Sequence, residues 1–124
     1  MKSSGNNRIV VDWDGTCVNE VWPGQGDWLP GAVDTLKSFL AEGWDVVIFS
    51  TRLSKKNVDE VTDFDGHEDT VLALRRKLDD AGLQEVDIWL KDWKPGAVYY
   101  IDDKAIRFEG KWYDVVKQIE RNGK

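Results

Sequence analysis

Residues 9 to 16 read Ile-Val-Val-Asp-Trp-Asp-Gly-Thr, and this stretch decides the fold. Three β-branched apolar residues in succession predict a short buried strand, whereas the polar residues 1–7 before it predict a disordered tail. Two acids, Asp12 and Asp14, follow the strand directly, and Gly15 permits a tight turn behind them. The stretch therefore predicts a buried strand that ends in two carboxylates.

Apolar segments recur along the rest of the chain and alternate between strand and helix patterns. The predicted order is helix 32–42, strand 45–49, helix 71–81, strand 86–90, strand 97–101 and helix 112–121. Strands that are largely apolar and alternate with helices form parallel sheets that are covered on both faces and joined by right-handed crossovers. Residues 8–124 are therefore predicted to form one doubly wound, Rossmann-like α/β domain.

The composition suits a globular protein of 124 residues with a formal net charge of −6. The sequence contains no apolar run of about 18 residues and no charged-then-apolar leader, so a soluble, cytoplasmic protein is expected. Cys17 is the single cysteine, cannot form an internal disulfide, and is predicted to be a small filler beside the strand end. The negative charge disfavours binding to nucleic acid, including phosphorylated nucleic-acid ends.

Polar side chains follow the predicted strands at the edge where ligands bind in such sheets. They are Asp12, Asp14 and Thr16 after the first strand, Ser50, Thr51 and Arg52 after the second, Lys94 before the fourth, and Asp102 and Asp103 after it. Four carboxylates at one edge repel one another unless a cation is present. Their hard oxygen atoms suit Mg²⁺, so a magnesium site is predicted there.

A carboxylate beside a cation can attack phosphorus and form an aspartyl-phosphate that water then hydrolyses. Asp12 is the candidate nucleophile. Asp14, two residues further on, could protonate the leaving alcohol and later deprotonate water. A hydroxyl group and a lysine at the same edge could bind the charged oxygens of the phosphoryl group. These residue types predict a phosphatase that acts on a phosphorylated small molecule or nucleotide.

The ordered motifs resemble those of the haloacid dehalogenase superfamily. Residues 10–16 are similar to its first motif, residues 46–50 to the second, Lys94 to the third, and residues 100–103 to the fourth. The resemblance implies that Asp12 is nucleophile and Mg²⁺ ligand, and that Asp14 is general acid/base and contributes its backbone carbonyl to the metal. It also implies that Ser50 and Lys94 hold the phosphoryl group and that Asp102 ligates Mg²⁺.

Several assignments stay open at this level. Lys91 competes with Lys94 for the phosphoryl group, and Asp103 either contacts the metal or acts through water. Arg52 is a candidate substrate contact or a surface residue, and His67 fits a helix entry better than a catalytic role. The loop after the nucleophile contains two tryptophans that either stack on a base or anchor the loop: Trp22 and Trp28.

The chain has no room for a cap domain over the site. About 35 residues separate Asp14 from Ser50, and about 43 separate Ser50 from Lys94, fewer than the roughly 50 of a small domain. The resemblance is therefore to the small, capless hydrolases of the superfamily. Rival functions are a phosphotransferase, a phosphate-binding module without turnover, and a receiver-type signalling domain. The last would place its acid pair after the first strand and its phosphorylated aspartate after the third.

Overall fold

The structure is a computed structural model that describes residues 6–21, 25–50, 53, 67–91, 93–105 and 107–122, with the backbone alone at 67–69 and 122. Its elements are β1 (Arg8–Val11), α1 (Ala32–Ala41), β2 (Asp45–Ile48), α3 (His67–Asp80), β3 (Asp87–Ile88), β4 (Tyr99–Ile101) and α4 (Trp112–Asn122). Most of the predicted tail, residues 1–5, lies outside this description. The described part of the chain contains no helix that is both long and apolar enough to cross a membrane.

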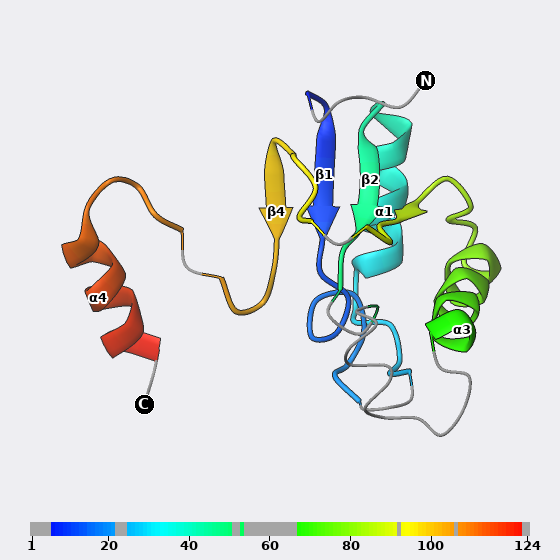
Figure 1. The fold of residues 1–124 in the computed structure, drawn as a ribbon, viewed down its shortest axis with the longest axis horizontal. Coiled ribbons are helices and arrows are strands. Elements are labelled where there is room, and N and C mark those ends of the chain that lie inside the picture. The colour runs from blue at the N-terminus through cyan, green and yellow to red at the C-terminus, as the bar shows by residue number, and fades with distance from the viewer. Residues whose placement is uncertain are drawn as a thin grey trace.

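The four strands form one parallel sheet in the order β3-β2-β1-β4 (Figure 1). Strand β1 is an interior strand, with Val11 paired to Ile48 of β2 on one side and to Ile101 of β4 on the other. Because all pairings are parallel, the carboxyl ends of the strands meet at one edge of the sheet. This arrangement confirms the predicted Rossmann-like α/β fold in a single small domain.

The core lies on one face of the sheet, between the strands and two helices. Ile9 and Val11 of β1 and Val46 and Ile48 of β2 point to this face because side chains alternate along a strand. They join one buried cluster with Leu36 of α1 and with Leu74 and Leu78 of α3, which are at most 3% exposed. Both helices therefore cover the same face of the sheet.

The opposite face carries a charged pair near the start of β1. Arg8 Nε lies 3.0 Å from Asp45 Oδ2, and the two side chains are only 11% and 7% exposed. Arg8 Nη1 also donates to the carbonyl oxygen of Gly96, and its guanidinium lies 5.3 Å from the ring centre of Trp89. The segment between β3 and β4 thus covers this face of β1 and β2.

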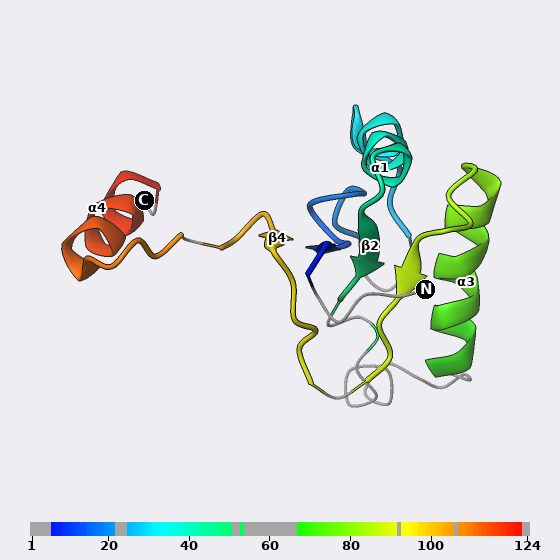
Figure 2. The same ribbon diagram turned by 90° about the horizontal axis from the view of Figure 1, so that it is seen from above.

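Helix α4 differs from the other helices in its position. Viewed from two directions, it stands apart from the sheet at the end of an extended segment that follows β4 (Figures 1 and 2). Its first residues, Trp112 and Tyr113, are 72% and 69% exposed. In the described part of the chain, no strand or other helix packs closely against α4.

Candidate active site

Two neighbouring strands deliver the acidic residues to the same edge of the sheet. The backbone N–H of Asp12 donates to the carbonyl oxygen of Ile101 at 2.9 Å, which extends the β1–β4 pairing by one step. Asp12 therefore leaves β1 beside the point where Asp102 and Asp103 leave β4. The backbone N–H of Phe49 donates to the carbonyl oxygen of Val11 at 3.1 Å, so the end of β2 reaches this edge as well.

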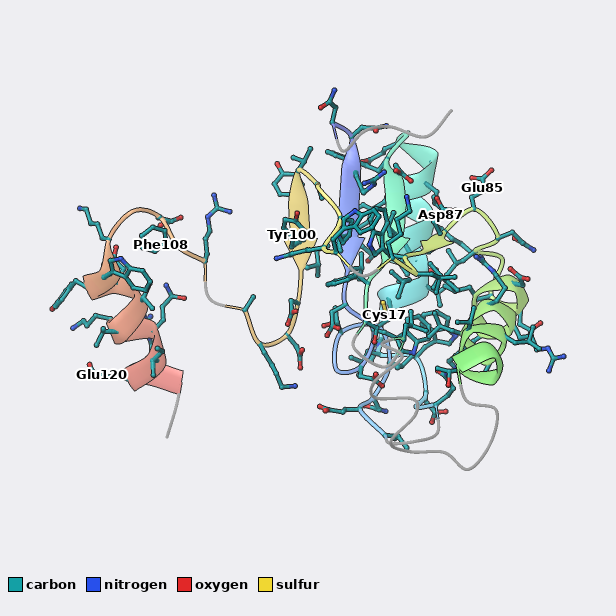
Figure 3. All side chains as sticks on the ribbon, viewed as in Figure 1. Cys17, Glu85, Asp87, Tyr100, Phe108 and Glu120 are labelled. Carbon is teal, nitrogen blue, oxygen red and sulfur yellow. The ribbon has the colours of Figure 1, made fainter. Side chains whose placement is uncertain are left out.

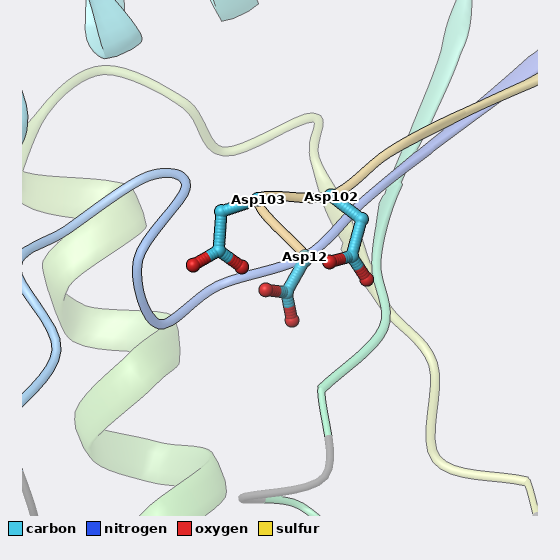
Figure 4. Close-up of side chains that lie close together, drawn as sticks. All are labelled: Asp12, Asp102 and Asp103. Atoms are coloured by element: carbon cyan, nitrogen blue, oxygen red, sulfur yellow. The ribbon is translucent and has the colours of Figure 1, made fainter. Parts of the chain in front are cut away.

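Three carboxylates converge at this edge (Figure 4). One oxygen from each of Asp12, Asp102 and Asp103 lies within 4.8 Å of the others. Partial burial, followed by the charge of Asp102, raises the pKa of Asp12 from 3.8 to about 6, and Asp103 and Asp14 add smaller repulsions. A site that disfavours its own negative charge in this way is prepared for a cation or for a proton.

The loop after Asp12 folds tightly around one carbonyl group. The backbone N–H groups of Thr16 and Cys17 donate to the carbonyl oxygen of Trp13 at 3.2 and 2.9 Å, and Gly15 has a φ of 86°. A Cβ on Gly15 would lie 2.9 Å from Cγ of Asp103 and closer still to Oδ2. Glycine is therefore required here for its backbone conformation and for the space that the Asp103 carboxylate occupies.

Lys104 is a site residue that the sequence reasoning missed. Its Nζ lies 3.3 Å from Oδ2 of Asp103 and 3.3 Å from Oε1 of Glu20, and its backbone N–H donates to Oδ1 of Asp102 at 2.8 Å. The hydrogen bond to Asp103, followed by the one to Glu20, raises the pKa of Lys104. The position of Lys104 directly after Asp102 and Asp103 could have indicated a role at the site. Its pairing with Glu20 could not be predicted, because it depends on the fold.

The other predicted residues of the first two strand ends lie at the same edge, where the structure describes them. Thr16 donates its hydroxyl to Oδ2 of Asp12 at 3.4 Å. Asp14 is half-buried in the turn and is not one of the three converging carboxylates. Ser50, just beyond β2, is 7% exposed. Thr51 and Arg52 lie outside the described residues.

The two candidate phosphate-binding lysines lie on aromatic rings. Lys94 Nζ is 4.2 Å from the ring centre of Tyr100, and Lys91 Nζ is 5.3 Å from the rings of both Trp89 and Trp93. Among the described residues, no ion pair joins either lysine to the acidic cluster. The predicted role of Lys94 is therefore neither supported nor excluded by its position, because a lysine side chain can rotate toward a bound anion.

The loop that follows the turn is held by packing against the core. Trp28 contacts Trp13 edge to face at 5.3 Å, and Trp13 is completely buried with its Nε1 donating to Gln25 at 3.0 Å. Trp28 thus serves as an anchor, one of the two roles considered for it from the sequence, whereas Trp22 lies outside the described residues. Cys17 is buried, and burial raises its pKa to about 12, which suits a filler and not a nucleophile.

The donor set at this edge fits Mg²⁺. Its atoms are carboxylate oxygens, which are the ligands this ion prefers, and their mutual repulsion is relieved by a divalent cation. Two oxygens bound to one such ion lie at most about 4.2 Å apart, because the ion would hold each at about 2.0–2.1 Å, whereas the three carboxylate oxygens lie within 4.8 Å of one another. Small rotations of the exposed Asp102 and Asp103 side chains would close that difference.

The comparisons with known proteins concern the fold alone. No protein-family model matches the sequence, and no curated protein matches it. The chain is similar in structure to a conserved protein from Bacteroides thetaiotaomicron, with a TM-score of 0.53 and 24% sequence identity over 94% of this chain and 92% of that one. This similarity agrees with the parallel α/β sheet and extends over nearly the whole chain.

Proposed function

We propose that this protein is a Mg²⁺-dependent phosphomonoester hydrolase of the haloacid dehalogenase superfamily that works through an aspartyl-phosphate on Asp12. The observation that carries the proposal is the convergence of Asp12, Asp102 and Asp103 oxygens within 4.8 Å at the carboxyl edge of the sheet. A half-buried carboxylate directly after an interior strand, with two acids beside it, suits attack on phosphorus once a cation offsets the charge.

Mg²⁺ would be held by Asp12 and Asp102, with the backbone carbonyl of Asp14 and, directly or through water, Asp103. When bound, the ion would offset the negative charge of these carboxylates and of the phosphoryl oxygens. Because the pKa of Asp12 is raised to about 6 without an ion, a bound cation would also favour the anionic, nucleophilic form at neutral pH.

The reaction has two displacements at phosphorus. In the first, a carboxylate oxygen of Asp12 bonds to phosphorus, the bond from phosphorus to the leaving oxygen breaks, and Asp14 donates a proton to that oxygen. In the second, Asp14 takes a proton from water as the water oxygen bonds to phosphorus. The bond between Asp12 and phosphorus then breaks, which releases phosphate and restores both carboxyl groups.

The phosphoryl oxygens would be bound by Ser50 and Lys94, with Thr16, Thr51 and Arg52 as further substrate contacts. Lys104 is a further positively charged side chain beside the acidic cluster, with its Nζ 3.3 Å from Oδ2 of Asp103. A lysine ammonium binds phosphate as a compact point charge, so one such group near the transferred phosphoryl group offsets part of its charge.

The proposed substrates are small phosphate esters or nucleotides. The packing of Trp28 against Trp13 removes one of the two tryptophans that argued for stacking on a nucleobase. The net charge of −6 makes a nucleic-acid end the less favoured substrate. Substrate choice is therefore best decided by a screen that includes sugar phosphates, nucleotides and phosphorylated oligonucleotides.

The test is phosphate release from that panel by the purified protein, with Mg²⁺ and with chelator, using Asp12→Asn as the matched inactive variant. Mg²⁺-dependent release by the parent and none by Asp12→Asn is the expected result. Equal transfer to an added alcohol and to water would instead identify a phosphotransferase. Tight phosphate binding without any turnover by the parent would contradict the proposal and favour a binding module.

A further inference from the structure

Helix α4 presents an apolar stripe that the described part of its own domain does not cover. Trp112, Val115, Val116 and Ile119 recur at the spacing of one helix face. Trp112, Val116 and Ile119 are 72%, 49% and 52% exposed. An isolated helix of 11 residues is marginal in water, because it gains its stability from packing an amphipathic face. The stripe therefore needs a surface to cover it.

A matching surface lies between α1 and the edge strand β4. A groove of about 220 Å³ opens there, lined mainly by apolar side chains that include Val11, Leu36, Phe39 and Ile101. By the pairing register, Tyr99 and Ile101 lie on the same face as Ile9 and Val11, yet they remain 54% and 38% exposed. This groove, called the β4–α1 groove below, extends the core face of the sheet beyond the cover of α1.

The two surfaces belong to one chain but do not meet within it. Phe108 and Glu120, on either side of the α4 stripe in sequence, lie well away from Tyr100 of β4 (Figure 3). The segment after β4 leads α4 away from the sheet in both ribbon views (Figures 1 and 2). Helix α4 is thereby held where the groove of a neighbouring molecule is accessible to it.

Charge favours the same pairing. Residues 104–124 contain six Lys and Arg against three Asp and Glu, a net charge of +3, whereas residues 1–103 contain eleven against twenty, a net charge of −9. The basic residues 104–124 of one molecule and the acidic residues 1–103 of another attract each other, which speeds their encounter. The acidic parts of the two molecules repel each other, which disfavours direct contact between them.

We propose that α4 of one molecule docks in the β4–α1 groove of a second copy, so that two chains exchange their C-terminal helices. Because each copy offers both a helix and a groove, the exchange is reciprocal and closes as a twofold dimer. The apolar stripe of α4 and the exposed face of β4 then become buried together. This proposal does not rest on the proposed phosphatase activity.

The first test measures mass in solution. Sedimentation of the 124-residue parent at micromolar concentration should show a dimer, and Val116→Ser should weaken it about 10-fold or more, because Val116 lies in the stripe. Lys117→Arg is the control on the opposite side of the helix; it keeps the positive charge and should leave the dimer nearly unchanged. Both substitutions lie on a helix that stands apart, so the domain should fold in each variant.

The second test identifies the occupant of the groove, with Cys17→Ala in every variant because Cys17 lines the groove. Thr35 of α1 also lines the groove. A mixture of Thr35→Cys and Val116→Cys proteins should therefore form a disulfide between chains under mild oxidation, and a mixture of Thr35→Cys and Lys117→Cys should not. A within-chain disulfide in a monomeric Thr35→Cys, Val116→Cys double variant would overturn the proposal, because α4 would then cover its own groove. A monomer that forms neither disulfide would also overturn it.

Discussion

The backbone N–H of Asp12 donates to the carbonyl oxygen of Ile101 at 2.9 Å. This hydrogen bond holds the residue that follows β1 beside the last residue of β4. It explains why Asp12 and Asp102, which are 90 positions apart in the chain, present their carboxylates to one another. The position of the cluster therefore follows from strand register and not from the loops. Substitutions at the cluster should accordingly change charge and chemistry more than fold.

Asp12→Asn should change how the stability of the metal-free protein depends on pH. Between pH 3.8 and about 6 the folded state holds the Asp12 proton more tightly than the unfolded state, so the free energy of unfolding falls as pH rises through that window. The asparagine variant has no such proton and should lack this decline. At pH 8 without metal it should therefore have a higher Tm than the parent.

Thermal unfolding with chelator at a series of pH values measures this effect. Adding Mg²⁺ at pH 8 should raise the Tm of the parent, because the ion binds the folded state, and should raise that of Asp12→Asn much less. The same pH slope in both proteins would show that Asp12 does not carry the raised pKa.

Gly15→Ala should damage the site more than the fold. Alanine at a φ of 86° costs about 1–2 kcal/mol of stability, and its Cβ would also collide with the Asp103 carboxylate. Gly43→Ala is the matched control, since Gly43 has a φ of 93° and open space around its Cα. Both variants should lose similar backbone stability, whereas only Gly15→Ala should also weaken Mg²⁺ binding.

Chemical denaturation and Mg²⁺ titration of the two glycine variants separate these effects. If Gly15→Ala bound Mg²⁺ as tightly as Gly43→Ala, the close approach of Asp103 to the turn would have no role in the site.

Asp102→Asn should weaken Mg²⁺ binding more than Asp103→Asn. Oδ2 of Asp103 forms an ion pair with Nζ of Lys104 at 3.3 Å, so part of the negative charge of Asp103 is already offset. Oδ1 of Asp102 accepts a backbone hydrogen bond from Lys104 at 2.8 Å, and no lysine or arginine in the described part of the chain forms an ion pair with that carboxylate. Calorimetric titration measures both affinities, and the opposite ranking would make Asp103 the direct ligand.

Lys94→Met should weaken inhibition by inorganic phosphate about 10-fold or more, as expected for loss of a charge-assisted hydrogen bond. Lys91→Met is the matched control, because both lysines lie over aromatic rings in the structure. If Lys91→Met had the larger effect on the inhibition constant, the phosphate-binding role would pass to Lys91.

The sequence predicted the fold class and the convergence of three of the four acids, Asp12, Asp102 and Asp103, because both depend on strand order and apolar runs. It was less accurate at the edges of the sheet, where β3 comprises only Asp87–Ile88 and β4 only Tyr99–Ile101. Val86 is completely buried, yet its N–H bonds to Leu83 within a turn, so its apolar character reflects core packing and not strand pairing. A run of apolar residues indicates that they are buried, but a buried residue need not be hydrogen-bonded to a neighbouring strand.

Helix boundaries show the same limit. Helix α3 begins at His67, four residues before the first apolar position used to predict it, which agrees with the expected helix entry at His67. The first turn contains Glu68 and Asp69, and acids there favour a helix N-terminus without any apolar signal. The pairing of Lys104 with Glu20 lay beyond prediction, because it joins residues from two loops whose proximity only the folded chain creates.

The most direct test of the central claim is to trap phosphate on Asp12. The Asp14→Asn variant should form the covalent intermediate from a phosphate ester with an activated leaving group but hydrolyse it slowly, since it lacks the base that activates water. Peptide mass spectrometry after rapid acid quench should then find one phosphoryl group on the peptide that contains Asp12, only when Mg²⁺ is present. Phosphate release at the parent rate with no adduct on that peptide, or an adduct on another residue, would contradict the account.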